Sequence, residues 1–505
     1  MNNIIDEALN RVTMYRLVLY YVAGLLAVAF GLSFFALVPV DPTALVFSLV
    51  FITAACWATN RVFARLFRVP TNTESFVITA VILTLILPSV AATNLAGVAG
   101  LALASVVAIA SKFVLAIGRK HIFNPVAIGV SASALLLDQP ATWWVGGNLP
   151  LLPFVLVGGL VVVRKMQRFD MFATYMAANL LAVLATTSPS AAAEALSQSL
   201  LSSPLFFAGF AMLTEPLTAP HASAPRWIYG AIVGVLSSPN IHVGNVYLTP
   251  EIALLIGNLF AYAVSPKGRF KFTLVRVEET AANCYDFVFR PDRRILFQPG
   301  QYLDWTLEIR KPDGRGNRRA FTIASAPADG EVRLGVKFYS GPSAFKQSLS
   351  TMRPGDVIYG SQLAGSFTLP EDQTEKLAFI AGGIGVTPFR SMVQDLINRR
   401  DNRSVVVLYG NNSVDDIAYA EVFDRAEREL GIRTVYAVAD DARLGAHMQP
   451  GFINAALIRR EVPDFRDRTF YISGPRAMVL RFRRVLSELG VPRSRIRVDF
   501  FPGYA

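Results

Sequence analysis

Long apolar runs separated by short polar loops fill the first 265 residues of the chain. A helix that crosses a membrane needs about 20 consecutive apolar residues, with some tolerance for tilt. The ten segments that meet this pattern are 17–39, 43–60, 76–91, 95–117, 124–138, 150–164, 171–188, 198–214, 227–239 and 249–265. Two of them, 124–138 and 227–239, are short enough to be interrupted helices. Residues 1–267 therefore predict a polytopic all-α membrane domain of about ten transmembrane helices.

The loops between these segments alternate in charge. One set holds the basic residues, namely Arg11, Arg16, Arg61, Arg65, Arg68, Arg119, Lys120, Arg164, Lys165, Arg168, Arg226, Lys267 and Arg269. The opposite set has no Lys or Arg, only Asp41, Asp138, Glu194 and Glu251. Basic loops stay on the cytoplasmic side. The pattern predicts both termini in the cytoplasm, in a bacterial inner membrane, and no signal peptide is apparent.

The pattern changes twice after residue 268. Residues 270–370 alternate apolar and polar positions in short runs between turn signals such as Pro312-Asp313-Gly314, which is typical of an antiparallel β-barrel. From 372 onward, apolar strands at 376–381, 404–409 and 434–438 alternate with helices at 388–398 and 415–430. That alternation predicts an α/β domain with a parallel sheet.

The composition supports the division of the chain into an apolar first half and a more polar second half. Residues 1–265 contain only 21 of the 85 Lys, Arg, Asp and Glu residues, so the net charge of +11 reflects membrane borders and does not indicate nucleic acid. Cys56 and Cys284 are the only cysteines, too few for an iron–sulfur cluster, and the four histidines are scattered. We therefore expect no metal site, and any redox chemistry would use an organic cofactor.

Polar motifs interrupt the apolar half on its cytoplasmic side, at 71–75, 121–125 and 213–220. They fit helix capping, for example by Thr73, Ser75 or Asn124, and they equally fit helix N-termini directed at a phosphate or carbonyl. Lys112 lies inside the fourth segment. It could extend to the interface or serve a function within the membrane.

Three stretches of this half resemble the D subunit of the Rnf complex and the B subunit of the sodium-pumping NADH:quinone oxidoreductase. They read "TNTESFVITA", "RKHIFNPVAIGV" and "FFAGFAMLTEPLTAPHASAPRWIYGAIVGVL", and the likeness covers about residues 15–265. The resemblance implies flavin in the membrane domain, in part joined to a Ser-Gly-Ala-Thr loop. Here that loop reads Trp143–Asn148, so only a non-covalent FMN or riboflavin is expected. The two tryptophans fit either an interfacial aromatic belt or a stacking platform.

Three motifs in the second half have the residue types that a flavin and a dinucleotide require. In Arg319–Pro327, an arginine suits a phosphate, Phe321 the isoalloxazine ring and Thr322 its polar edge. Glycines in Ala381–Pro388 permit close backbone approach at a strand-to-helix turn that suits a pyrophosphate. Tyr471–Met478 ends another strand at the carboxyl edge of the sheet. Taken singly, each motif also fits an ordinary strand or turn.

In this order, "RAFTIASAP", "GGIGVTP" and "SGPRAM" resemble the ferredoxin–NADP reductase superfamily over residues 268–505. The resemblance implies a flavin-binding β-barrel at 268–371 and an NAD(P)-binding α/β domain at 372–505. Ser473 stands where the family usually has cysteine, and it is expected to be catalytic together with Thr322. The implied cofactor-binding residues are Arg319, Phe321, Thr322, Ile323, Ala324, Ser325, Ser343 or Lys346, Gly382, Gly383, Gly385, Thr387, Pro388, Gly474, Pro475, Met478, Asp499 and Tyr504. The last two belong to 499–504, which also fits a plain final strand.

These expectations combine into a membrane-bound flavoprotein that passes electrons from NAD(P)H through FAD, or FMN, to a quinone or another redox partner. The acidic segment Tyr409–Asp416 lacks arginine and so favours NADH over NADPH. The alternative is a reductase anchored to a transporter-like membrane domain without electron flow through it. An ion pump is a third option, for which the sequence offers no row of membrane acids because Asp138, Glu194 and Glu251 lie at loop edges.

Overall fold

The computed structural model describes residues 14–67, 73–117, 120–220, 223–244, 246–265, 269–309, 317–439 and 448–501, together with Leu9, Val12 and residues 443–445. The chain divides into two compact units, Met1–Lys267 and Gly268–Ala505. Each unit is described by itself.

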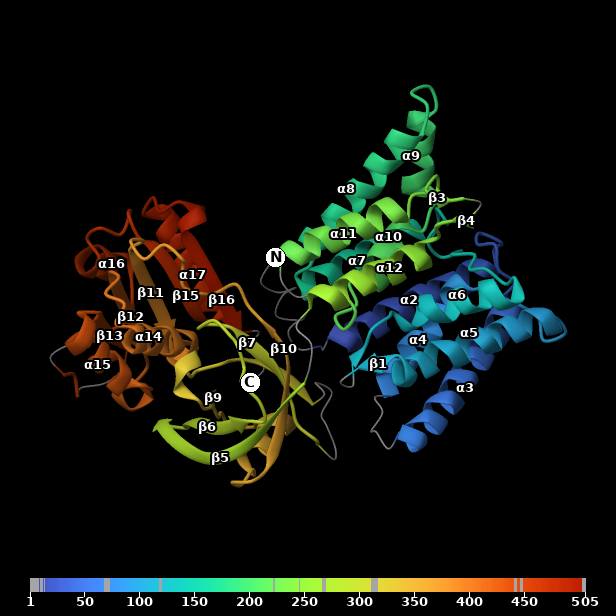
Figure 1. The fold of residues 1–505 in the computed structure, drawn as a ribbon. Coiled ribbons are helices and arrows are strands. Elements are labelled where there is room, and N and C mark those ends of the chain that lie inside the picture. Colours follow the sequence, from blue (N-terminus) through green and yellow to red (C-terminus); the bar gives the residue numbers. More distant parts are fainter. Residues whose placement is uncertain are drawn as a thin grey trace. The chain divides into compact units, whose positions relative to one another are not determined.

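The first unit is a bundle of helices (Figure 1). Each of the ten predicted apolar segments overlaps a helical stretch. The helices are α2 (Met14–Ser33), α3 (Pro42–Phe67), α4 (Thr73–Ile86), α5 (Leu95–Val114), α6 (Pro125–Leu137), α7 (Leu152–Met166), α8 (Phe169–Thr186), α9 (Ala192–Leu201), α10 (Leu205–Phe207) with the π-helix η1 (Ala208–Leu213), α11 (Ser223–Leu236) and α12 (Pro250–Val264). Two short hairpins, β1 (Ala116–Ile117) with β2 (Lys120–His121) and β3 (His242–Val243) with β4 (Val246–Tyr247), complete it.

Not all of these helices are long enough to cross a bilayer. Within the described residues, four are long and apolar enough by length and composition, namely α2, α3, α5 and α8, and a bent pair could make a fifth span. Four more helices are apolar but shorter. About four or five spans are therefore supported by length, and the expected ten go beyond what these lengths establish.

The segment predicted as one span at 198–214 is broken. Helix α9 ends at Leu201, and after Pro204 the chain continues as α10 and the π-helix, at an angle of 54° to α9. Proline lacks the amide hydrogen that would continue the helix, and its ring clashes with the preceding turn. The hydrophobic pattern alone does not reveal this break because both halves are apolar.

Small residues let neighbouring helices of this unit pack closely. A Cβ atom at Gly230 of α11 would lie 2.5 Å from the Met171 oxygen, and one at Gly234 would lie 2.4 Å from the Tyr175 oxygen, both on α8. Figure 1 shows α8 and α11 lying side by side. Glycines four residues apart on one helix face are typical of close helix pairs in membranes.

The second unit begins with an open antiparallel barrel, as predicted. Its strands are β5 (Phe270–Ala281), β6 (Cys284–Pro291), β7 (Tyr302–Thr306), β8 (Arg318–Thr322), β9 (Val332–Lys337) and β10 (Val357–Ala364), in the order β8-β7-β10-β5-β6-β9. The two end strands meet where the Ala324 amide donates to the Arg333 carbonyl at 2.9 Å. A short helix, α13 (Ala344–Ser350), follows β9, and Trp305 and Phe272 are fully buried in the barrel core.

A six-stranded parallel sheet follows, which confirms the predicted α/β pattern. Its strands are β11 (Leu377–Gly382), β12 (Val405–Asn411), β13 (Arg433–Val438), β14 (Met448–Pro450), β15 (Thr469–Pro475) and β16 (Ile496–Phe501). The order is β14-β13-β12-β11-β15-β16. The helices are α14 (Thr387–Arg399), α15 (Ala420–Leu430), α16 (Ala455–Glu461) and α17 (Arg476–Glu488). Separate hydrophobic clusters line the two sheet faces.

Candidate functional site

The strand order reverses between β11 and β15, and this defines the candidate nucleotide site. From β11 the chain adds β12, β13 and β14 on one side, and then returns to add β15 and β16 on the other. In open α/β sheets, ligands bind outside the carboxyl ends of the strands at such a switch point. The loops that follow these two strands are the predicted motifs at 382–388 and 473–478.

These two loops are packed closely against each other. A Cβ atom at Gly385 would lie 2.4 Å from the Gly474 Cα, and one at Gly382 would lie 2.3 Å from the Met478 sulfur. Gly383 has a φ of +50° and open space where a Cβ would stand. Pro388 lies in the first turn of α14, as predicted, and Thr387 begins that helix.

Ser473 and Asp499 are neighbours in this region. They are partners in the register of β15 and β16, and Pro475 ends β15. Ser473 is fully buried, and among the described residues its hydroxyl has no hydrogen-bond partner. Burial raises the pKa of Asp499 to about 6. Tyr504 lies outside the described residues, so its expected role stays a prediction.

The flavin motif lies on β8 with the predicted alternation. The Arg319 guanidinium lies over the Phe345 ring at 5.4 Å, and the Phe321 ring centre is 5.9 Å from that of Phe345. Arg319 and Phe321 therefore share one face. Thr322 is buried, and among the described residues its hydroxyl has no partner. A buried hydroxyl without a partner costs free energy unless a ligand or water satisfies it, which fits a bound cofactor at this end of the strand.

Other predicted residues near this strand are occupied by protein contacts. The Ile323 amide donates to the Gln301 carbonyl at 3.0 Å, and the Ala324 amide donates to the Arg333 carbonyl. The Ser343 hydroxyl caps α13 by accepting from the Lys346 amide at 3.4 Å, while the Lys346 ammonium donates to the Lys337 carbonyl at 2.8 Å. Their expected role in phosphate binding stays a prediction.

The structure also reveals two residues that sequence reasoning missed. In the first turns of α14, Arg390 donates to the Ala324 carbonyl at 2.9 Å and Ser391 donates to the Ser325 carbonyl at 2.7 Å. Both side chains are buried. An arginine three residues after Thr387, followed by serine, is the only signal that the sequence gives, because the contacts join residues 66 positions apart.

A buried tyrosine–aspartate pair forms a second link between the barrel and the α/β part. The Tyr419 hydroxyl donates to Asp286 of β6, whose other oxygen accepts from Arg333 at 3.2 Å. Burial, followed by the neighbouring carboxylate, raises the pKa of Tyr419 well above its ordinary value, so the hydroxyl stays protonated and remains a donor. Tyr419 has a φ of +63°, a conformation that is strained for a bulky residue.

The acidic segment that favoured NADH is engaged in ion pairs. Asp416 pairs with Lys337 at 2.5 Å, and Asp415 pairs with Arg443 at 2.8 Å. The segment itself lacks arginine, but the fold brings Arg443 beside it from a distant loop. The expected preference for NADH stays a prediction.

In the helical unit, two of the three polar motifs meet around Glu215. Its carboxylate accepts from the Asn124 side chain at 2.8 Å and from the Thr218 hydroxyl at 3.2 Å, and His121 lies 3.2 Å away. Asn124 also caps α6 through the Ala127 amide, which confirms the capping prediction. Lys112 contacts α4, and the alternative that it extends to the interface stays a prediction. Its ammonium donates to the Ser75 carbonyl and hydroxyl and to Thr79 on α4.

The two tryptophans of the 143–148 loop are buried, so they do not form an interfacial belt. Trp144 donates to the Thr84 and Leu87 carbonyls, and Trp143 donates to Glu251 at 3.1 Å. Glu251 was expected at a loop edge. It is the second residue of α12, next to the loop that ends at Thr249, and it is buried.

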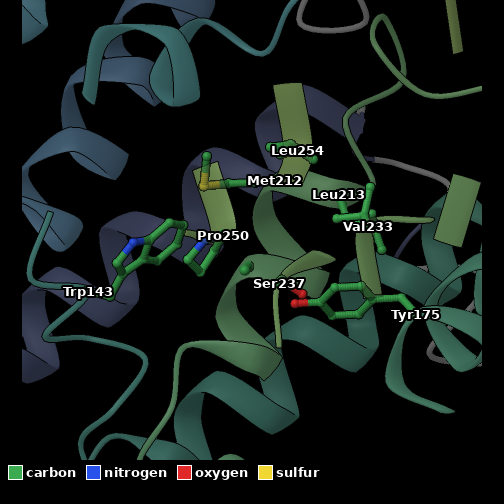
Figure 2. A pocket seen from close by; sticks show the side chains of 9 residues that line it. Trp143, Tyr175, Met212, Leu213, Val233, Ser237, Pro250 and Leu254 are labelled. Atoms are coloured by element: carbon green, nitrogen blue, oxygen red, sulfur yellow. The ribbon is translucent and has the colours of Figure 1, made fainter. Parts of the chain in front are cut away.

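Trp143 borders a small cavity beside the π-helix (Figure 2), which Tyr175, Met212 and Leu254 also line. Its volume is about 10 Å³, at the lower limit for one water molecule. A flavin ring could enter here only if the lining side chains moved.

Two stretches of the chain match known families. Residues 131–266 match the NQR2, RnfD, RnfE family, and residues 379–484 match the oxidoreductase NAD-binding domain. The first match lies within the helical unit and the second within the parallel-sheet part. These matches agree with the resemblances expected for each half.

Curated relatives match about half of the chain. A flavohemoprotein from Pseudomonas putida is 30% identical over 240 residues, which are 46% of this chain and 59% of the relative. The glycine betaine monooxygenase reductase subunit from Pseudomonas aeruginosa is 24% identical, over 46% of this chain and 64% of the relative. The chain thus spans less than two thirds of the length of these relatives.

Two solved structures are also similar to this chain. The flavohem-like FAD/NAD binding domain of nitric oxide dioxygenase from Vibrio cholerae is 22% identical and covers 46% of this chain and 98% of its own, with a TM-score of 0.41. A flavohemoglobin from Malassezia yamatoensis with bound FAD and heme is 20% identical and covers 69% of this chain and 98% of its own, with a TM-score of 0.44.

Proposed function

We propose that the protein is a membrane-bound, flavin-dependent NAD(P)H oxidoreductase that delivers electrons to an acceptor in or across the membrane. The observation that carries the proposal is the close packing of the two glycine loops, 382–388 and 473–478, at the switch point of the parallel sheet. Helix α14, which follows the first loop, is hydrogen-bonded to the segment that contains the flavin motif. The matches to an NAD-binding oxidoreductase domain and to the NQR2, RnfD, RnfE family support it.

The residues present fit a flavin and a dinucleotide. Arg319 would hold the flavin phosphate and Phe321 would cover the ring. Thr322 and Ser473 would offer hydroxyls that have no partner among the described residues. Gly382, Gly383 and Gly385 with Gly474 would admit the dinucleotide backbone at the start of α14. A bound flavin would accept a hydride and release its electrons singly. FAD is the expected flavin and FMN the alternative.

The helical half would receive these electrons. We propose that the ten helical stretches include short and broken segments of a membrane domain, with both termini in the cytoplasm of a bacterial inner membrane. The proposed acceptor is a quinone or another redox partner. A covalently linked reductase stays close to the membrane domain, which raises its effective concentration there.

The second candidate function is a reductase anchored to a membrane domain that carries no electrons. The small cavity at Trp143 favours it, because that arrangement leaves no space for a flavin beside the loop. Flavin analysis of the purified protein separates the two functions. Two flavins per chain would support electron flow through the membrane domain, whereas one flavin per chain would support the anchored reductase.

The reductase proposal is tested by anaerobic stopped-flow bleaching of the flavin with NADH and with NADPH. The unchanged protein should bleach with at least one nucleotide. Gly383→Val should not, because valine is strained at a φ of +50°. Quinones and soluble acceptors added after reduction would then identify the acceptor. A protein that binds flavin but bleaches with neither nucleotide would contradict the proposal.

Asp499 should make the reduction rate depend on pH. Its pKa of about 6 means that the carboxyl is neutral below pH 6 and ionised above it. Hydride loss leaves a positive charge on the nicotinamide, which a nearby carboxylate stabilises. We therefore expect the rate to rise roughly three- to tenfold, or about 1 kcal/mol, as the pH increases through 6. In Asp499→Asn the rate should stay at its low-pH value, and a retained inflection near pH 6 would show that another group is responsible.

A further inference from the structure

We propose that Ser391 and Arg390 are positioning residues that set the distance between the flavin and the nicotinamide. The inference rests on the proposed function and adds residues to which no role has been assigned. Both belong to α14, whose first residue, Thr387, directly follows the nucleotide loop. Arg390 and Ser391 therefore lie about one helical turn beyond that loop.

The two side chains bind carbonyl groups of the segment that follows β8, residues 323–325. Ser391 is fully buried and donates to the Ser325 carbonyl at 2.7 Å, and Arg390 donates to the Ala324 carbonyl at 2.9 Å. These carbonyls come two and three residues after Thr322, the last residue of β8. Charge-assisted and buried hydrogen bonds such as these fix geometry more firmly than exposed ones.

The barrel holds the same segment from its amide side. The Ile323 and Ala324 amides donate to carbonyls of Gln301 and Arg333, and the Ser325 hydroxyl accepts from the Arg333 amide at 3.1 Å. The segment is thus bound on both edges and cannot shift without breaking hydrogen bonds. One edge is fixed by the flavin barrel and the other by the helix that starts at the nucleotide loop.

Asp329 anchors the Arg390 side of this connection. Its carboxylate accepts from Arg390 at 3.3 Å, from the Ala326 amide at 2.9 Å and from Asn398, two turns further along α14, at 3.1 Å. Thr387 also packs on the barrel, because a Cβ atom at Gly335 of β9 would lie 2.8 Å from its methyl carbon. One face of α14, from Thr387 to Asn398, therefore contacts the barrel.

This arrangement matters because hydride transfer is sensitive to position. A displacement of about 1 Å between reacting groups can cost about a hundredfold in rate. Ser391 and Arg390 would contact neither cofactor and would act only through the segment that they hold. Their loss should therefore lower the rate of the chemical step without lowering the affinity for either cofactor.

The test is anaerobic stopped-flow reduction of the full-length protein by the nucleotide that bleaches the unchanged protein. The variants are Ser391→Ala, Arg390→Met and Arg390→Lys. The limiting rate, the nucleotide dissociation constant, the flavin content and the long-wavelength nicotinamide–flavin charge-transfer band are measured. The matched controls are Ser350→Ala, whose hydroxyl donates to the Gln347 carbonyl of its own helix, and Arg399→Met, whose side chain is exposed on α14.

We expect Ser391→Ala and Arg390→Met to lower the limiting rate by about tenfold and to weaken the charge-transfer band. Flavin content should be unchanged and the nucleotide dissociation constant should stay within twofold. Arg390→Lys should recover part of the rate, and the controls should match the unchanged protein.

Limiting rates within twofold of the unchanged protein, or flavin loss in proportion to rate loss, would overturn the inference. Either result would leave the proposed function intact as long as the unchanged protein bleaches. Failure of the unchanged protein to bleach is a different outcome, which would reject the proposed function and this inference together.

Discussion

Gly385→Ala should lower nucleotide-dependent flavin reduction by about a hundredfold or more while the flavin content stays normal. The added Cβ atom would lie 2.4 Å from the Gly474 Cα and 2.8 Å from the Ser473 carbonyl oxygen. These neighbours are backbone atoms that cannot rotate away, so the two loops must separate. The dinucleotide would then lose the surface that both loops form together. Flavin binding depends on the barrel and should be spared.

The measurement is the bleaching rate as a function of NADH and NADPH concentration, with flavin content taken from the absorbance spectrum. Gly445→Ala is the matched control, because its Cβ atom would have ordinary contacts of 3.7 Å or more. A Gly385→Ala protein that bleaches as fast as this control would show that the dinucleotide does not bind between these loops.

Much of the fold of the second unit follows from local patterns. Alternation along 270–370 and the apolar strands after 372 predict the barrel and the parallel sheet, because strand and helix periodicities are local properties of the chain. Pro388 at the start of α14 and the shared face of Arg319 and Phe321 were predictable for the same reason.

The fold of the helical half was less predictable. Each of the ten segments that hydrophobicity predicts overlaps a described helix, but hydrophobicity does not distinguish a helix that crosses a bilayer from one of 13 to 15 residues such as α6 or α12. The burial of Glu251 and Trp143 depends on a contact between residues 108 positions apart. Such a contact is set by how helices pack, which apolar patterns do not specify.

Some parts of the candidate site could also be predicted from local sequence, and other parts could not. The glycine loops and the flavin motif are contiguous stretches, so they could be proposed from sequence, although their roles stay predictions. Arg390 and Ser391 could not, since a buried arginine in a helix is unusual and its partner is a backbone carbonyl. A carbonyl leaves no residue type in the sequence that would mark it as an acceptor. Arg443 beside Asp415 is missed for a similar reason, because only the tertiary fold brings them together.

Arg319→Met should weaken FAD binding by about tenfold to a hundredfold, since a charge-assisted hydrogen bond to a phosphate contributes roughly 1.5–3 kcal/mol. Methionine keeps much of the apolar stem that packs near Phe345 and removes the cation. Riboflavin has no phosphate, so its affinity should be equal in the variant and the unchanged protein. This comparison separates a phosphate contact from a general loss of structure.

The measurement is a titration of flavin-stripped protein with FAD, FMN and riboflavin, followed by flavin fluorescence. Arg318→Met is the control one residue away. Its side chain is 36% exposed and its guanidinium lies 3.9 Å from Asp304, so it should leave all three affinities unchanged. If riboflavin binding fell as far as FAD binding in Arg319→Met, the arginine would support the barrel itself. If no affinity changed, the flavin phosphate would have to be held by other residues, and Ser343 and Lys346 would be the next to test. The cation at position 319 thus decides whether β8 is a flavin-binding strand or only part of the barrel wall.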